Sequence, residues 1–210
     1  MIEPIFPLEL VSYPGETVNL HIFEPRYRQM MQECHDDESS FVIAPFMDGK
    51  IMPYGTRMIL SQIVNIYDDG KMDVTVKGLK KVRLRDVVNP VEGKLYAGAV
   101  TEVVDDDGIS DAFKNDQIHA LVLRFQELIK ADKTIIVGRT FKVYDLAQKI
   151  GLSAEQKYEL LTTHSEKARQ DYVIHHLQHI IPMIKQIEDA KARIQMNGHF
   201  PSFGGKSLDF

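Results

Sequence analysis

The stretch that decides the fold is PIFPLELVSYPGETVNLHIFEPRYRQMM, which spans residues 4–31. Near its middle, Pro14 and Gly15 are typical of a tight turn, because proline presets φ and glycine tolerates a positive φ. After the turn, residues 24–33 carry apolar side chains at helical spacing. Pro25 is compatible with the first turn of that helix, where its missing N–H costs nothing. The stretch therefore predicts strands around a turn, followed by a helix.

Outward from this stretch, residues 4–104 show strand and turn patterns. Residues 60–67 are rich in β-branched and apolar side chains, and the Asp-Asp-Gly that follows at 68–70 is typical of a hairpin connection. Apolar and polar residues then alternate as in a half-buried strand, with Met72, Val74, Val76, Val82 and Leu84 as the apolar members. Residues 96–104 complete a first half that is predicted to be β-rich.

The pattern changes at Asp105-Asp106-Asp107-Gly108, which predicts a solvated linker. Beyond it, a helical stripe is formed by Ile118, Leu121, Val122, Phe125, Leu128 and Ile129. A short helix over 142–150 is predicted to end at Gly151. We expect capping boxes at Ser153 with Gln156 and at Thr163 with Glu166.

The last long helix carries a second stripe, made of Val173, Leu177, Ile180, Ile184 and Ile187. Pro182 lies inside this run and is predicted to kink or split the helix, because it removes a backbone donor. We therefore expect a β-rich subdomain over 1–104, an α-helical subdomain over 105–197 and a flexible tail over 198–210.

Composition limits the function further. The chain has 210 residues and a net charge of −5, which argues against a dedicated nucleic-acid binder, since such proteins need basic surface. Its one cysteine, Cys34, excludes an internal disulfide and fits a reducing compartment. No secretory signal or membrane-length apolar run is present, so we expect a cytoplasmic protein without a membrane partner.

Three motifs in the opening stretch resemble those of one known family. They are Phe6-Pro7-Leu8, Tyr13-Pro14-Gly15, and Ile22-Phe23-Glu24-Pro25-Arg26-Tyr27. Tyr54-Gly55-Thr56 and Val76-Lys77-Gly78-Leu79 are similar to later positions of the same family, while Asn19 departs from its usual proline. The chain thus resembles the N-terminal, substrate-recognition domain of Lon proteases, and we expect it to be a stand-alone member.

The resemblance implies an α+β fold, with a β-rich, PUA-like pseudobarrel followed by a helical bundle. In full-length Lon this unit recognises unfolded or tagged polypeptides and passes them to an ATPase and a Ser-Lys protease. Since no ATPase or protease sequence follows, we expect a binding module that has no catalytic activity and needs no cofactor. Its expected partners are unfolded or exposed apolar polypeptide segments, with a protease or ATPase as a further partner in protein quality control.

Two groups of residues are candidates for the binding surface. Glu24, Arg26 and Tyr27 form the core of the six-residue string and could touch a partner, or could tie the helix to the sheet. A second group lies in a methionine- and aromatic-rich segment and consists of Phe46, Met47, Met52 and Tyr54. Such side chains can adapt to many peptide sequences, but they could equally fill the chain's own core.

Two alternative functions remain open at this stage. Asp171, His175 and His179 recur at i, i+4, i+8 on a polar helix face, a weak indication of a metal-dependent hydrolase, because zinc sites need three or four ligands. Lys80, Lys81, Arg83 and Arg85 could form a basic stripe for RNA, although a solvated outer strand face explains them as well.

Overall fold

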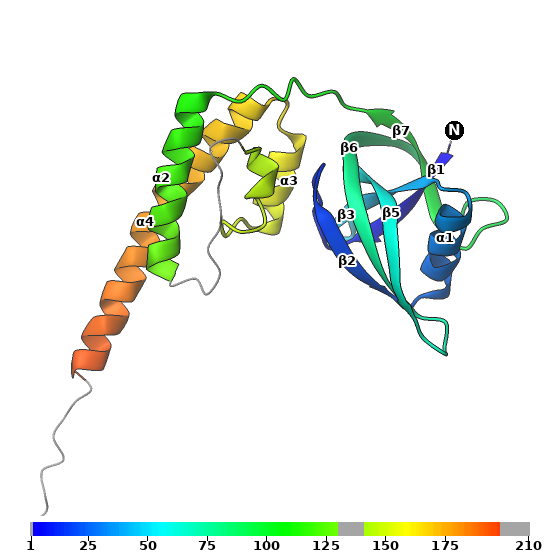
Figure 1. Cartoon of the computed structure of the whole chain (residues 1–210), viewed down its shortest axis with the longest axis horizontal. Helices are drawn as coiled ribbons and strands as arrows, with labels where there is room; N and C mark the ends of the chain where they lie inside the picture. Colours follow the sequence, from blue (N-terminus) through cyan, green and yellow to red (C-terminus); the bar gives the residue numbers. More distant parts are fainter. Residues whose placement is uncertain (1, 130–140, 198–210) are drawn as a thin grey trace, which may run out of the picture.

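The computed structural model describes residues 2–129 and 141–197. The β-rich part contains β1 (Ile2–Leu8), β2 (Thr17–Ile22), α1 (Pro25–Asp36), β3 (Ser40–Met47), β4 (Lys50–Ile51), β5 (Tyr54–Ile66), β6 (Met72–Val88) and β7 (Ala97–Val103). The helical part contains α2 (Ala112–Ile129), the 3₁₀ turn η1 (Val143–Asp145), α3 (Ala154–Thr162) and α4 (Glu166–Asn197). Figure 1 shows the two parts side by side, joined by an extended linker between β7 and α2.

The sheet closes on itself and forms a barrel. Its strand order is β1-β7-β6-β5-β3-β4, and β1 also pairs in parallel with β3, from Ile5 opposite Val42 to Leu8 opposite Pro45. The long strand β6 additionally pairs with β2. Closure removes most exposed strand edges, and α1 contributes Tyr27, Met30 and Met31 to the core. The predicted α+β fold is confirmed, with a barrel-like first half and helices after it.

Most predicted elements of the first half are present. The helix expected at 24–33 is α1, which runs three residues further, to Asp36. The Asp-Asp-Gly sequence joins β5 and β6, and Gly70 adopts a φ of 78° there. The alternating residues Met72, Val74 and Val76 are buried, as expected for one face of a strand.

The tight turn at 13–16 approaches β6 very closely. The Gly15 N–H donates to the Gly78 carbonyl (2.9 Å), and the Gly78 N–H donates to the Glu16 carbonyl (2.8 Å). A Cβ at Gly78 would overlap the carbonyl oxygen of Tyr13, so only glycine fits at that position. The close approach explains the glycine at position 78, whereas Gly15 is explained by its φ of 86°, since a Cβ there would meet no atom within 4 Å.

The segment between β1 and β2 anchors the barrel in the helical part. Tyr13 is fully buried, and its ring stacks on Tyr144 with centroids 4.8 Å apart. Its hydroxyl donates to the Lys157 carbonyl of α3 (3.0 Å). Val11 and Tyr13 belong to the core cluster of the helices and not to the core of the barrel. Burial therefore raises the pKa of the Tyr13 hydroxyl well above its ordinary value.

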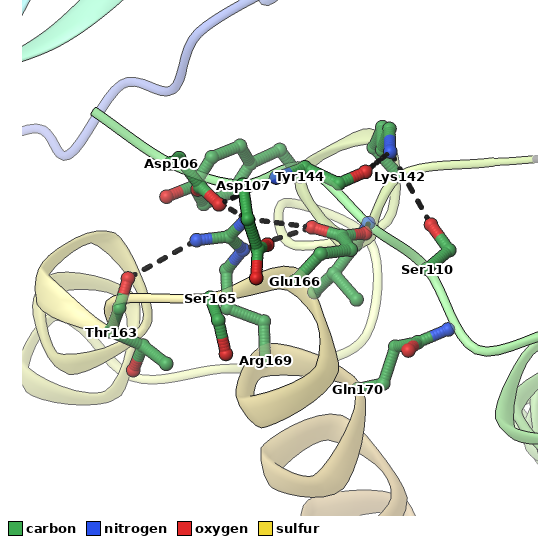
Figure 2. Close-up of polar contacts among 12 residues, drawn as sticks. Asp106, Asp107, Ser110, Lys142, Tyr144, Thr163, Ser165, Glu166, Arg169 and Gln170 are labelled. Carbon is green, nitrogen blue, oxygen red and sulfur yellow. Dashed lines mark hydrogen bonds and ion pairs between the residues drawn. The ribbon is translucent and has the colours of Figure 1, made fainter.

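A buried ionic cluster holds the linker against the helices (Figure 2). The Arg169 side chain is only 2% exposed, contacts Glu166 at 2.8 Å, pairs with Asp106 and lies over the Tyr144 ring. Glu166 is also buried and accepts the Val143 N–H at 2.7 Å. The expectation of a solvated linker is therefore wrong at Asp106, because the buried guanidinium of Arg169 requires carboxylate partners.

Three predictions in the helical half need correction. The Ser153–Gln156 capping box is present, but Thr163 does not cap α4. Its hydroxyl donates to Glu159, and Ser165 accepts the Ala168 N–H instead, because Glu166 is committed to the buried cluster. Within 142–150 only η1 is helical, followed by turns that end at Gly151, where φ is 73°.

The long helix α4 continues through Pro182, so the expected split does not occur. Its stripe is buried at Val173 and Leu177, but Ile187 is 53% exposed because α4 extends beyond the other helices (Figure 1). The domain boundary at 104/105 stays a prediction. The tail expected at 198–210 lies outside the described residues.

We predict that Tyr13→Ala lowers the free energy of unfolding by about 3–5 kcal/mol, because it empties a packed site between the two halves. Tyr13→Phe should cost only about 0.5–1.5 kcal/mol, the usual net value of one hydrogen bond. Urea unfolding followed by circular dichroism measures both. Equal effects of the two variants would contradict the packing role.

We also predict that Arg169→Met lowers the free energy of unfolding by about 3–5 kcal/mol, because it leaves the buried Glu166 carboxylate without its cation. Lys191→Met is the matched control, since it removes an exposed ion pair with Glu188 in the same helix. That control should change stability by less than about 1 kcal/mol. Thermal unfolding of both variants gives the comparison.

Candidate functional site

A groove opens where β1 and β3 separate. Their parallel pairing ends at Leu8 opposite Pro45, and the chain then turns away towards the helices, because Val11 and Tyr13 are buried there. On that side, no strand of the described structure pairs with the end of β3. The resulting cavity has a volume of about 330 Å³. It is lined by Glu9, Leu10, Val11, Pro45, Phe46, Met47, Asp48, Ala154, Glu155 and Lys157.

The first turn of α3 forms the third wall of the groove. Ser153 begins this helix with a reciprocal capping box, in which its hydroxyl accepts the Gln156 N–H and the Gln156 side chain accepts the Ser153 N–H. The bond between Tyr13 and the Lys157 carbonyl fixes α3 against the barrel. The site therefore combines segments more than 100 residues apart in the sequence.

The lining is divided between an apolar floor and a charged rim. Leu10, Pro45, Phe46, Met47 and Ala154 provide apolar surface. The rim carries the carboxylates of Glu9, Asp48 and Glu155 and one ammonium group, on Lys157. The hydrogen bond from the Ser153 hydroxyl (2.7 Å) holds the pKa of Glu155 below its ordinary value. No metal-binding or nucleophilic constellation is built into this lining, so its chemistry is suited to binding.

The methionine- and aromatic-rich segment is divided by the structure. Phe46 and Met47 are half-buried and line the groove. Met52 and Tyr54 are half-buried as well but are not part of the lining. The Met52 N–H donates to the Pro45 carbonyl, and the Tyr54 N–H donates to the Tyr158 hydroxyl of α3 (3.2 Å). A binding role for these four residues stays a prediction.

The second predicted group lies elsewhere, at the start of α1. Tyr27 is buried against the ring of Phe6, with centroids 4.0 Å apart. Arg26 lies over the Tyr27 ring and pairs with Glu24 at 2.8 Å. Tyr27 thus connects α1 to the barrel, while Glu24 and Arg26 form an exposed ion pair beside its ring. Whether these three residues contact a partner stays a prediction.

The first alternative site lies on an exposed face of α4, as the sequence predicted. Asp171, His175 and His179 are exposed, and Asp171 pairs with Lys114 at 2.6 Å. In the described part of the chain, no three histidine, cysteine or acidic side chains are arranged to hold a metal ion.

The basic stripe is interrupted at Lys81. This side chain is buried where the barrel meets the helices, and its ammonium donates to the Thr163 carbonyl (3.0 Å). Its placement on a solvated strand face was therefore wrong. Burial also lowers the pKa of Lys81, so this residue adds little to a basic surface.

A larger hollow, of about 540 Å³, lies between α1, β1 and β7. Burial would raise the pKa of Glu3 there, but hydrogen bonds from Arg57, Thr101 and Ser40 outweigh it and lower the pKa. Glu33 pairs with Lys94 at 2.8 Å in the same hollow. Because these charges already satisfy one another, this hollow offers fewer free groups to a ligand than the groove.

Sequence reasoning identified only Phe46 and Met47 of the residues that line the groove. Glu9, Leu10 and the first turn of α3 were not among the predicted residues, since no local pattern brings residues 9–11 next to residues 154–157. The capping box did indicate where α3 begins. It could not indicate what that first turn would face.

The comparisons with known proteins agree with this architecture. The model of the ATP-dependent protease La (LON) substrate-binding domain matches residues 3–179. A Lon N-terminal domain protein from Xanthomonas campestris is similar, with 23% identity and a TM-score of 0.62, over 83% of this chain and 98% of that one. The N-terminal domain of Mycobacterium avium complex Lon protease is also similar, with 16% identity and a TM-score of 0.67. The match covers 85% of this chain and 98% of that one.

At these identities the two solved structures show the fold alone. No curated protein matches the chain. None of the described helices is long and apolar enough to cross a bilayer. Because the family model covers most of the sequence, including the groove and both structural halves, the chain belongs to the family of Lon substrate-binding domains.

Proposed function

We propose that this chain binds unfolded or exposed apolar polypeptide segments in the groove between β3 and α3, without catalysing a reaction on them. The observation that carries the proposal is the half-exposed pair Phe46 and Met47, which forms the floor of a cavity between barrel and helices. Family membership supports a role in substrate binding.

The groove has properties that suit a variable polypeptide. Methionine and aromatic side chains can adopt several rotamers against different partners, which favours binding of many sequences at modest affinity. Pairing between β1 and β3 ends just before Phe46, which leaves room for an extended peptide beside the end of β3. Both properties favour the binding of a peptide, and neither requires a catalytic side chain.

We further propose that the chain acts as an adapter that brings clients to a protease or ATPase partner. The barrel and the helices form a rigid support for the groove, held by Tyr13 and by the Arg169 cluster. A module of this kind contributes to proteolysis by raising the local concentration of the client near the partner. It needs no cofactor for that task.

We predict that an apolar peptide with uncharged flanks binds the wild-type chain and that Phe46→Ala weakens the binding about tenfold, since aromatic anchors in a groove contribute 1 kcal/mol or more. Fluorescence anisotropy with a labelled peptide measures the affinity. Phe113→Ala is the matched control, because Phe113 is 78% exposed on α2 and is not part of the groove.

The control variant should bind as the wild type does. If Phe46→Ala and Phe113→Ala bind equally well, the groove is not the binding site. If no apolar peptide binds the wild-type chain at any concentration up to the millimolar range, the proposed function is wrong.

The adapter role predicts a separate result. Added wild-type chain should accelerate the ATP-dependent degradation of an unfolded client in a lysate of its own cells, whereas Phe46→Ala should not. The client's half-life, followed by gel electrophoresis, is the readout. Peptide binding without any effect on degradation would leave the chain a binding module but would contradict the adapter role.

A further inference from the structure

We propose that the groove selects apolar segments that are flanked by lysine or arginine and discriminates against segments flanked by acidic residues. This inference rests on the proposed function and concerns the class of client that the same groove accepts. The partner is a polypeptide with an apolar centre and cationic neighbours. The argument depends on the charges of the rim and on whether they are already neutralised.

Two of the three rim carboxylates have no partner among the residues that the structure describes. Glu9 and Asp48 are exposed, and neither forms a hydrogen bond or an ion pair with any residue in the described ranges 2–129 and 141–197. They lie on different segments, Glu9 just after β1 and Asp48 in the turn between β3 and β4. Both are therefore available to a ligand in the groove.

Glu155 adds a third negative charge from the side of α3. Its carboxylate accepts the Ser153 hydroxyl, which lowers its pKa and keeps it ionised at neutral pH. The N-terminus of α3 contributes a partial positive charge of about 0.5, which Glu155 in the first turn offsets. The helix end therefore does not turn the groove into a site for anions.

The single cation of the rim does not balance these carboxylates. Lys157 lies close enough to Glu16 to lower the pKa of that carboxyl, against the larger effect of burial, which raises it. Lys157 thus also interacts electrostatically with Glu16, which lies where the helices meet the barrel. Three carboxylates against one ammonium leave the lining with a net charge of −2. By contrast, the larger hollow already pairs Arg57 with Glu3 and Lys94 with Glu33.

The apolar floor and the acidic rim favour different parts of one ligand. In this proposal Phe46 and Met47 contact the apolar side chains of the ligand, while Glu9 and Asp48, which come from two different segments of the lining, contact its cations. A lysine or arginine can lie with its apolar stem on the floor and its charge at the rim. Exposed ion pairs contribute only modestly, so the preference is expected to be about tenfold at low salt and to decrease as salt screens the charges.

The first experiment uses the wild-type chain and three labelled peptides with the same apolar centre, flanked by lysine, glutamine or glutamate. Fluorescence anisotropy at about 20 mM and 500 mM salt gives the affinities. We expect the lysine-flanked peptide to bind about tenfold more tightly than the glutamate-flanked one at low salt, with the difference falling to about twofold at high salt.

The second experiment tests the location of the charges. Glu9→Gln combined with Asp48→Asn removes the two unpaired carboxylates, and asparagine tolerates the φ of 50° at position 48. The matched control combines Glu92→Gln with Asp116→Asn, two exposed carboxylates without partners in the described structure and outside the groove. Both double variants change the net charge equally.

The groove variant should bind the lysine-flanked peptide about threefold to tenfold more weakly, whereas the control should bind it as the wild type does. Both double variants should bind the glutamine-flanked peptide with the affinity of the wild type. Equal binding of all three peptides, or equal losses in both variants, overturns the charge preference but leaves the proposed function intact. If none of the three peptides binds, the proposed function itself fails.

Discussion

The insertion of Tyr13 into the helical half is the contact on which the rest of the structure depends. The turn at Tyr13 to Glu16 is fixed against β6 through hydrogen bonds with Gly78, so its position is set by the barrel. Its side chain is nevertheless buried among helices, stacked on Tyr144 and bonded to α3. One short segment thus belongs to both halves, and it positions α3 relative to the sheet.

The groove is a consequence of this insertion. Because the chain must leave the sheet after Leu8 to bring Val11 and Tyr13 to the helices, β1 cannot continue beside β3. The end of β3 then faces α3 across a space that no other segment of the described structure fills. The Arg169 cluster supports the same geometry from the linker side, where Asp106 pairs with Arg169 and Lys81 of β6 donates to the Thr163 carbonyl.

This arrangement separates the buried polar groups that stabilise the fold from the exposed groups that line the groove. The buried Tyr13 joins the two halves through its bond to α3, and the buried pair of Arg169 and Glu166 stabilises the helical half. The hydroxyl and the charges of these residues are already satisfied within the protein. The exposed polar groups of the groove are carboxylates beside an apolar floor. We propose that such a surface holds a polypeptide through shape, apolar contact and charge.

The sequence by itself determined the local elements, because periodicity, turn chemistry and capping act over a few residues. Alternation at Met72, Val74 and Val76, the turn at Pro14-Gly15 and the capping box at Ser153 were all readable in this way. The family motifs added the fold class, and the match over residues 3–179 supports it.

Only the tertiary structure decided the burial and the bonding of side chains whose partners are distant in sequence. Lys81 alternates with apolar neighbours as a surface residue would, yet it is buried against Thr163, and Glu166 forms an ion pair instead of a capping box. The groove likewise needs residues 9–11, 45–48 and 154–157 together. Their proximity follows from long-range packing, and packing between segments more than 100 residues apart leaves no local pattern in the chain.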